Sequence, residues 1–225
     1  MCRYKKIDLE NWCRKEHYLY YTNSLNVEVN MTANIDVSEL LTFCHTNGYK
    51  FYPTLIYCVT KVLNRIENFK MFKDKNGDLC VWDSLVPNYT IFHEEDHTFS
   101  DCWTDFTDDF GSFYKNITSD MELGKTKRGI KVKSGQPANF YCVSCTPWTA
   151  FTAVSSRMVN GGAAFFPIIT AGKYDDNYQM PVNITIAHAV ADGYHIGLFF
   201  EYLQEEISAK CLLSNLKLNC KTKSH

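Results

Sequence analysis

The stretch Val182-Asn-Ile-Thr-Ile-Ala-His188-Ala-Val-Ala-Asp192-Gly193-Tyr-His195 decides how this chain of 225 residues is read. Its first half is rich in β-branched residues, which indicates a buried strand, and a helix is predicted from about residue 193 to residue 208. The strand therefore delivers His188 directly into a turn that carries Asp192 and Gly193. Neutral imidazole titrates at about pH 6.5, so a histidine in this place could take a proton from a hydroxyl and return it. On spacing alone, a structural histidine is the commoner explanation.

The rest of the chain alternates between helical and strand patterns, without a repeat, a low-complexity tract or a linker. The periodicity predicts helices at residues 14–21, 36–48 and about 53–66. The first turn of the second helix resembles a capping box formed by Asp36 and Glu39. Strands are predicted at residues 25–35, 89–92, 139–146, 151–155, 164–170 and 182–189. Asn76-Gly77 marks a hairpin, and residues 124–137 form a loop. We expect one α/β domain over residues 1–225, a two-layer sandwich with a large mixed β-sheet.

Composition favours a folded protein with small-molecule partners. The chain is 45% hydrophobic and 15% aromatic, which supplies an extensive core. The formal net charge is −2 without a long basic run, so nucleic acid is not an expected partner. No stretch of about 18 apolar residues and no leader-like start occur, which predicts no membrane partner and a cytoplasmic location. The ten cysteines are then expected to be reduced thiols.

Cys142 and Cys145 have the C-x-x-C spacing of redox and zinc sites. They lie in a predicted strand, where positions three apart point to opposite faces, and no second C-x-x-C pair supplies further ligands. Buried free thiols are the better interpretation, and no metal site is predicted.

The segment His188-Ala-Val-Ala-Asp192-Gly193 resembles the His-x-x-x-Asp-Gly signature of CoA-dependent acyltransferases. Dihydrolipoamide acyltransferases, plant acyltransferases and peptide-synthetase condensation domains share that signature. Further stretches, in family order from near residue 5 to near residue 207, resemble the chloramphenicol acetyltransferases. They are Asp8-Leu-Glu-Asn-Trp12-Cys-Arg14-Lys-Glu-His, Tyr49-Lys50-Phe-Tyr-Pro53, Val81-Trp82-Asp, Tyr89-Thr-Ile-Phe92-His, Thr98-Phe99-Ser100, Pro147-Trp148 and Pro167-Ile-Ile-Thr170-Ala-Gly-Lys173-Tyr174.

The resemblance implies the fold of that family and an acetyl-CoA-dependent O-acetyltransferase that acts on chloramphenicol, an antibiotic-resistance activity. It also implies a homotrimer with active sites at subunit interfaces, in which His188 faces an acceptor pocket supplied largely by a neighbour. His188 would be the general base, and Ser144 would donate a hydrogen bond to the tetrahedral oxyanion. Asp192 would pair with Arg14 to hold the catalytic turn. No acyl-enzyme and no metal are expected.

The resemblance also assigns the two substrate pockets. Lys50, Lys173 and Tyr174 match positions that line the CoA tunnel, and Trp148, from the strand region of Ser144, is a fourth candidate for binding CoA. Trp148 has a competing interpretation as a core residue. The acceptor pocket would include Tyr21 and Phe99 from the neighbouring chain, and Thr170. Three further positions depart from the family, with Val29 in place of a phenylalanine, Ser156 in place of a leucine and Lys131 in place of an aromatic residue. These changes predict a roomier and more polar pocket.

Three alternatives share the fold. The first is the same chemistry on another small alcohol or amine. The second is a subunit of a dihydrolipoamide acyltransferase core, which is disfavoured because we see no lipoyl domain or flexible linker before the catalytic segment. The third is a binding protein without catalysis, and the presence of Ser144, His188 and Asp192 argues against it.

Overall fold

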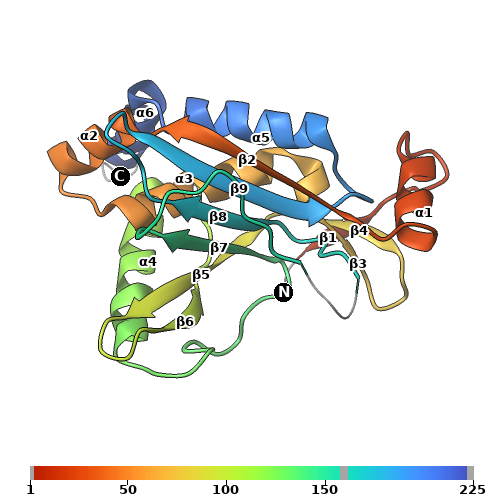
Figure 1. Cartoon of the computed structure of the whole chain (residues 1–225), viewed down its shortest axis with the longest axis horizontal. Helices are drawn as coiled ribbons and strands as arrows, with labels where there is room; N and C mark the ends of the chain where they lie inside the picture. Colours follow the sequence, from red (N-terminus) through yellow and green to blue (C-terminus); the bar gives the residue numbers. More distant parts are fainter. Residues whose placement is uncertain (1–2, 158–161, 222–225) are drawn as a thin grey trace.

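The computed structural model describes residues 3–157 and 162–221. In chain order, the elements are β1 (Tyr4–Lys6), α1 (Lys15–Asn23), β2 (Glu28–Asp36), α2 (Ser38–Asn47), α3 (Phe51–Arg65), the 3-10 helix η1 (Glu67–Lys70), β3 (Met71–Lys73), β4 (Leu79–Trp82), β5 (Val86–His93), β6 (Thr98–Trp103), α4 (Phe110–Lys125), β7 (Phe140–Thr146), β8 (Ile168–Gly172), β9 (Gln179–Ala187), α5 (Gly193–Glu206) and α6 (Ala209–Lys221). Figure 1 shows their arrangement.

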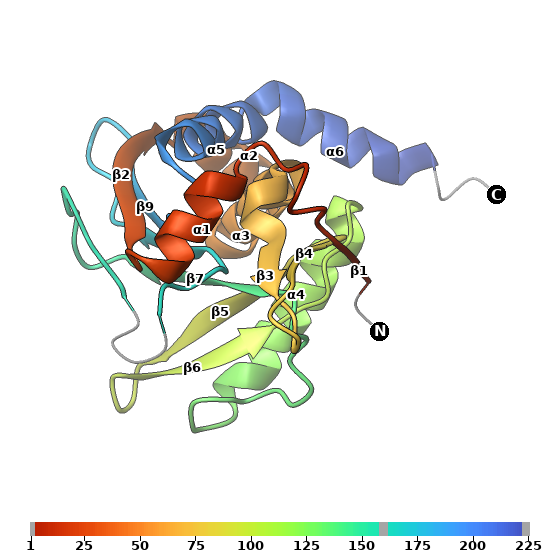
Figure 2. The same cartoon turned by 90° about the vertical axis from the view of Figure 1, so that its right-hand side faces the viewer.

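The main sheet has six strands in the order β2-β9-β8-β7-β5-β6. β7 runs parallel to both β5 and β8, while the other neighbours are antiparallel, so the sheet is mixed. Helices α2, α3 and α5 lie together on one side of these strands, and loops lie on the other side (Figure 2). The predicted two-layer α/β sandwich with a large mixed sheet is confirmed. The predicted hairpin at Asn76-Gly77 is also present, between β3 and β4, with Gly77 at φ 83°.

Strand alternation gives the sheet two different faces. On β5, Tyr89 and Ile91 enter the core under the helices, so Asn88 and Thr90 point to the opposite face. We call this opposite side the outer face. It is polar even where it is buried, because Asn183 is 2% exposed and donates hydrogen bonds to groups of β2. A face that is polar although it is buried indicates that its residues have a role other than packing.

Residues 151–155 do not form the predicted strand and lie instead in the connection between β7 and β8. The sequence of residues 151–155 does alternate like that of a strand. However, β7 already pairs directly with β8, so no position between these two strands is left for it. Phe151 packs its ring against Gly172, where a Cβ atom would meet the ring at 2.8 Å. The segment is thus anchored by side-chain packing rather than by a backbone ladder.

The predicted capping box of α2 is also wrong. The helix begins at Ser38 after Val37, and Asp36 Oδ1 accepts a hydrogen bond from the Ser38 backbone N–H at 2.9 Å. Glu39 instead accepts a hydrogen bond from the backbone N–H of Ala209, at the start of α6. The Glu39 carboxylate, which the local pattern assigned to the cap of α2, therefore binds the start of α6 instead.

Strands β1 and β6, the 3-10 helix η1 and helices α4 and α6 were not predicted. For α4 the signals were present in the sequence: Asp109 caps the helix by accepting from Ser112 N at 2.7 Å. Phe110, Phe113 and Ile117 follow at helical spacing, and all three are buried. The two missed helices complete the helical layer, since α4 contacts β5 and β6 and α6 contacts α2 and α4.

Candidate active site

His188 follows β9 directly and begins the turn into α5. Its backbone N–H donates to Val27 O at 2.9 Å, which ties the turn to the start of β2. Its Nδ1 atom lies 3.1 Å from Ala191 O. A carbonyl oxygen can only accept, so Nδ1 carries a hydrogen, and in the neutral imidazole the lone pair is on Nε2. The fold therefore orients the ring so that Nε2 is the nitrogen that can accept a proton.

Asp192 joins the turn after β9 to the N-terminal segment, and the predicted pair with Arg14 is present. Its Oδ2 atom accepts a hydrogen bond from Arg14 Nη1, while Oδ1 caps α5 by accepting from Tyr194 N at 3.0 Å. His195 Nδ1 lies 2.9 Å from the same Oδ1 atom. Burial raises the pKa of Asp192, but the hydrogen bonds from Arg14 and His195 outweigh it and bring the pKa to about 2. Asp192 is thus an anion bound to Arg14 rather than a third member of a charge relay to His188.

Tyr21 stacks on His188 of its own chain, with ring centroids 4.0 Å apart and an interplanar angle of 16°. The expectation that Tyr21 reaches His188 from a neighbouring chain is therefore wrong. Helix α1, which carries Tyr21, lies at the end of β9 where His188 emerges (Figure 1). The sequence contained no signal for this contact, because it depends on how α1 packs against the sheet.

Ser144 lies on the outer face of β7, next to Thr170 of β8, which in turn lies next to Asn183 of β9. His188 is five residues beyond Asn183 along the chain. With about 3.4 Å per residue and about 4.8 Å per strand, His188 and Ser144 of one chain are about 19 Å apart. A proton transfer and an oxyanion contact need atoms about 3 Å apart. One chain therefore does not bring the two groups to a common substrate.

The sheet splits open beside Ser144. The parallel ladder between β5 and β7 ends at the pair Tyr89 and Val143, one residue before Ser144. Tyr52 of α3 donates its hydroxyl to Val143 O at 3.2 Å, which supplies a partner where the ladder stops. Sequence analysis did not single out Tyr52, because nothing in its local pattern marks this contact.

A pocket of about 450 Å³ lies in this split. It is lined from the helical side by the ends of α3 and α4 and from the sheet by residues of both faces, including Ile91, Thr90 and Cys145. Its lining is mostly apolar or aromatic, and Lys50, Lys125 and Glu122 stand among its residues. The pocket thus leads from the helical side of the sheet to the residue next to Ser144.

The structure places the four CoA candidates at or beside this pocket. Trp148 is 62% exposed, contacts the ring of Phe92 and lines the pocket, so its interpretation as a core residue is wrong. Lys50 also lines it, with Nζ 2.8 Å from Glu122 Oε1. Tyr174 lies 6.3 Å from the ring of Phe51, another lining residue, and Lys173 precedes Tyr174 at the exposed end of β8. Cations are suited to bind phosphates, and a largely apolar pocket is suited to bind the apolar part of a small molecule.

The acceptor candidates divide between the two faces of the sheet. Phe99 is 51% exposed on the outer face of β6, and Thr170 lies beside Ser144. Lys131 lies next to β6, where it forms an ion pair with Asp101 at 2.8 Å. Asp101 comes two residues after Phe99 on β6 and therefore points to the same face of the sheet. This spacing is the sequence signal that could have identified Asp101 as a neighbour of Phe99.

Two acceptor candidates lie elsewhere. Val29 pairs with Ile186 and packs against the hydrophobic core, so it faces the helical side and the structure does not bring it to Ser144. Ser156 is exposed on the loop between β7 and β8.

Cys142 and Cys145 are unpaired, and burial raises the pKa of each thiol to about 11. Among residues 3–157 and 162–221, no three His, Cys, Asp or Glu side chains gather as they would around a metal ion. Within the same ranges, no helix has the length and apolar character needed to cross a membrane.

Comparison with known proteins identifies the family. Residues 2–204 match the family described as chloramphenicol acetyltransferase. A chloramphenicol acetyltransferase of Clostridium perfringens is 39% identical over 206 residues, which cover 90% of this chain and 94% of the relative. That of Staphylococcus aureus is 38% identical over 205 residues, covering 90% and 94%. Chloramphenicol acetyltransferase 3 of Escherichia coli is 34% identical over 210 residues, covering 92% and 98%.

Solved structures agree with this fold. A chloramphenicol acetyltransferase superposes with a TM-score of 0.76 at 22% identity, covering 92% of this chain and 99% of the other. The dihydrolipoamide acetyltransferase of Azotobacter vinelandii gives a TM-score of 0.63 at 13% identity, covering 88% of each chain. The sequence relatives, over nearly their whole length, show that this chain belongs to the chloramphenicol acetyltransferase family.

Proposed function

We propose that this protein transfers the acetyl group of acetyl-CoA to a hydroxyl of chloramphenicol, with His188 as the general base. The observation that carries the proposal is the bond from His188 Nδ1 to Ala191 O, which makes Nε2, at the end of β9, the nitrogen that can take up a proton. The relatives are named for this activity, and the pocket beside Ser144 has the size and lining expected for the thioester arm of CoA.

In the proposed reaction, His188 Nε2 takes the proton of the acceptor hydroxyl while its oxygen attacks the thioester carbonyl carbon. Ser144 donates a hydrogen bond to the oxyanion that forms, a contribution typically worth about 3 kcal/mol. The carbon–sulfur bond then breaks, and the thiolate of CoA takes the proton back from His188. Acetyl leaves as an ester on the acceptor, so no group remains on the protein.

The roughly 19 Å between His188 and Ser144 of one chain supports a shared site. We infer that His188 and Tyr21 of one subunit face Ser144, Thr170 and Phe99 of its neighbour, in a closed ring of three subunits. The buried polar residues of the outer face, such as Asn183, fit a surface that meets a second copy. The unpaired cysteines of the described chain support a reducing, cytoplasmic setting.

The central test follows acetyl transfer by the release of free CoA thiol in the presence of chloramphenicol. His188→Ala should reduce kcat by about 10²- to 10⁴-fold, while the matched variant His45→Ala, on the exposed side of α2, should retain it. A His188→Ala enzyme that kept more than about a tenth of the activity would contradict the role of general base.

A second test addresses the shared site. Chains carrying His188→Ala and chains carrying Ser144→Ala are each expected to be nearly inactive. Mixing them under conditions that exchange subunits should restore activity, because some interfaces then combine an intact His188 with an intact Ser144. Mixed assemblies without recovered turnover, or an active monomer in light scattering, would exclude the arrangement.

A further inference from the structure

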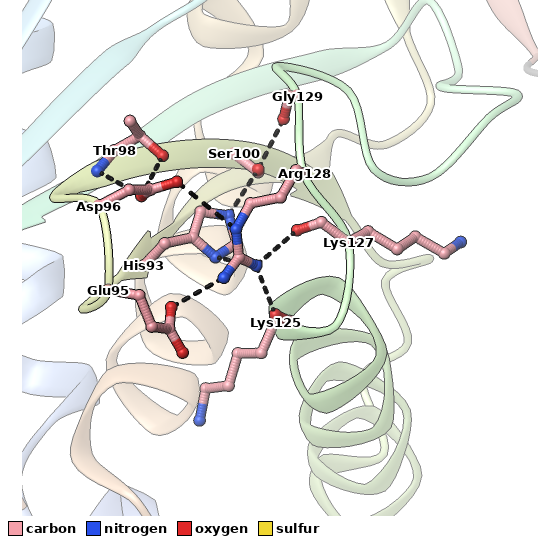
Figure 3. A network of polar contacts seen from close by, with 9 residues as sticks. All are labelled: His93, Glu95, Asp96, Thr98, Ser100, Lys125, Lys127, Arg128 and Gly129. Carbon is pink, nitrogen blue, oxygen red and sulfur yellow. Dashed lines mark hydrogen bonds and ion pairs between the residues drawn. The ribbon is translucent and has the colours of Figure 1, made fainter.

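A chain of hydrogen bonds links the end of β5 to the segment that follows α4 (Figure 3). His93 is 2% exposed; its Nε2 lies 2.7 Å from Ser100 Oγ and its Nδ1 lies 3.2 Å from Arg128 Nη1. A guanidinium only donates, so Nδ1 accepts and the imidazole hydrogen is on Nε2. Ser100 then accepts from His93 and donates its own hydroxyl to Gly129 O at 2.6 Å. Every ring nitrogen of His93 is therefore used within the protein.

Arg128 fastens the same segment at several further points (Figure 3). Its Nη1 atom donates to the carbonyl oxygens of Lys125 and Lys127, at 3.0 and 3.1 Å. Its Nη2 atom lies 2.8 Å from Glu95, and Nε lies 3.5 Å from Asp96, both in the turn between β5 and β6. The exposed ion pairs contribute little alone, but together with the buried His93 they fix where the chain leaves α4.

The fixed segment continues along β6 as an additional partner of that strand. Asp101 N donates to Ile130 O at 2.6 Å, and Val132 N donates to Asp101 O at 3.2 Å. Lys131 therefore lies opposite Asp101, and its Nζ atom donates to Asp101 Oδ2 at 2.8 Å and to Gln136 Oε1 at 2.9 Å. We call Phe99, Asp101 and Lys131 the acceptor wall. It stands on the outer face, across the split in the sheet from Ser144.

The acceptor wall has defined chemistry. Phe99 offers a half-exposed ring, and the ammonium of Lys131, also half exposed, uses two of its three N–H groups on Asp101 and Gln136. The third N–H remains for a substrate atom. The neighbouring carboxylate of Asp101 disfavours an anion there, so the wall suits a neutral hydrogen-bond acceptor such as a nitro or carbonyl oxygen.

Resting on the proposed function, we propose that the acceptor wall selects alcohols that carry an aromatic ring with a neutral hydrogen-bond-accepting group, which Lys131 binds. We further propose that His93 is the positioning residue of this wall, acting through Ser100 and Arg128. Neither residue takes part in the transfer of the acetyl group, so the two should affect recognition of the acceptor and not of acetyl-CoA.

The selection is tested by steady-state kinetics with chloramphenicol and with its analogue in which hydrogen replaces the nitro group. Lys131→Met should raise the KM for chloramphenicol about fivefold to tenfold, the effect of one net hydrogen bond, and should abolish the preference for the nitro compound. The KM for acetyl-CoA and kcat should stay within about twofold. Lys115→Met, on exposed α4, is the matched control. An unchanged nitro preference in Lys131→Met would overturn the selection.

The positioning role is tested with His93→Ala and with the milder Ser100→Ala, which removes the link to Gly129 if the first variant fails to fold. Both should raise the KM for both acceptors and leave the KM for acetyl-CoA unchanged, whereas equal losses for both substrates would show a merely structural role. Hydrogen exchange provides a readout independent of activity. The backbone N–H groups of Asp101 and Val132 should lose at least about tenfold in protection. Unchanged protection would overturn the positioning role even if chloramphenicol proved not to be a substrate.

Discussion

Replacing Asp192 with asparagine should destabilise the protein by roughly 2 to 3 kcal/mol at neutral pH. The folded protein lowers the pKa of Asp192 from the ordinary value of 3.8 to about 2. Lowering the pKa from 3.8 to about 2 corresponds to about 2.5 kcal/mol of preference for the ionised form. The side chains of Arg14 and Asp192 are 13% and 30% exposed, so solvent screens the pair only in part.

The cost has a second source in Arg14. Its Nε and Nη2 atoms are buried, and neither has a hydrogen-bond partner among the described residues. Asparagine keeps the shape of the cap on α5 but removes the charge that neutralises the guanidinium, and an uncompensated buried charge is strongly destabilising. Arg14→Ala should therefore be no worse than Asp192→Asn, and the double variant should recover at least about 1 kcal/mol relative to the sum of the two.

The assay is urea unfolding followed by tryptophan fluorescence, at one fixed protomer concentration because assembly affects the midpoint. Glu67→Gln, which removes a partner of exposed Lys5, is the matched control and should cost less than about 1 kcal/mol. Since the folded pKa is depressed, the stabilisation is complete above about pH 5 and is lost as the pH falls from about 4 to about 2. A cost below about 0.5 kcal/mol at pH 7, or a cost that persisted at pH 2, would refute the reasoning.

Three further predictions concern packing and the cofactor. Gly172→Ala should lower the melting temperature measured by differential scanning fluorimetry, because its Cβ atom would lie 2.8 Å from both the Phe151 ring and Pro181; a neutral result would mean that the loop is not anchored there. Leu212→Ala should lower the free energy of unfolding in urea by about 2 to 4 kcal/mol, because this side chain of α6 is only 1% exposed. Leu213→Ala, at an exposed position of the same helix, should lower it little, and equal losses would contradict the packing of α6. Trp148→Ala should raise the KM for acetyl-CoA severalfold in steady-state assays and have little effect on thermal stability, because the ring lines the pocket and is largely exposed. A loss of stability with an unchanged KM would show that Trp148 acts as a packing residue instead.

Local patterns predicted the elements that a few neighbouring residues determine. The strand before His188, the helix after Asp192 and the hairpin at Gly77 each carry their signals within a few positions. The pairing of Arg14 with Asp192 came from resemblance to the family, and the structure brings the two residues together across 178 positions of sequence.

The features that sequence analysis missed depend on tertiary neighbours. Residues 151–155 alternate like a strand, but the ladder position that they would need is taken by β8. Tyr21 stacks on His188 because α1 packs beside the sheet, and no spacing of residues in the sequence indicates that α1 packs there. Glu39 does not form the expected capping contact on α2, because α6, itself unpredicted, supplies a competing backbone N–H donor.

The split between β5 and β7 has a consequence for how the two substrates of the proposed reaction would reach the site. Because the pocket enters this split from the helical side while the proposed acceptor wall stands on the outer face, we expect the two substrates to approach along separate routes. On such routes neither substrate would block the entrance of the other. We therefore expect donor and acceptor to be held together in one ternary complex, with either substrate binding first and with no acetyl group stored on the protein.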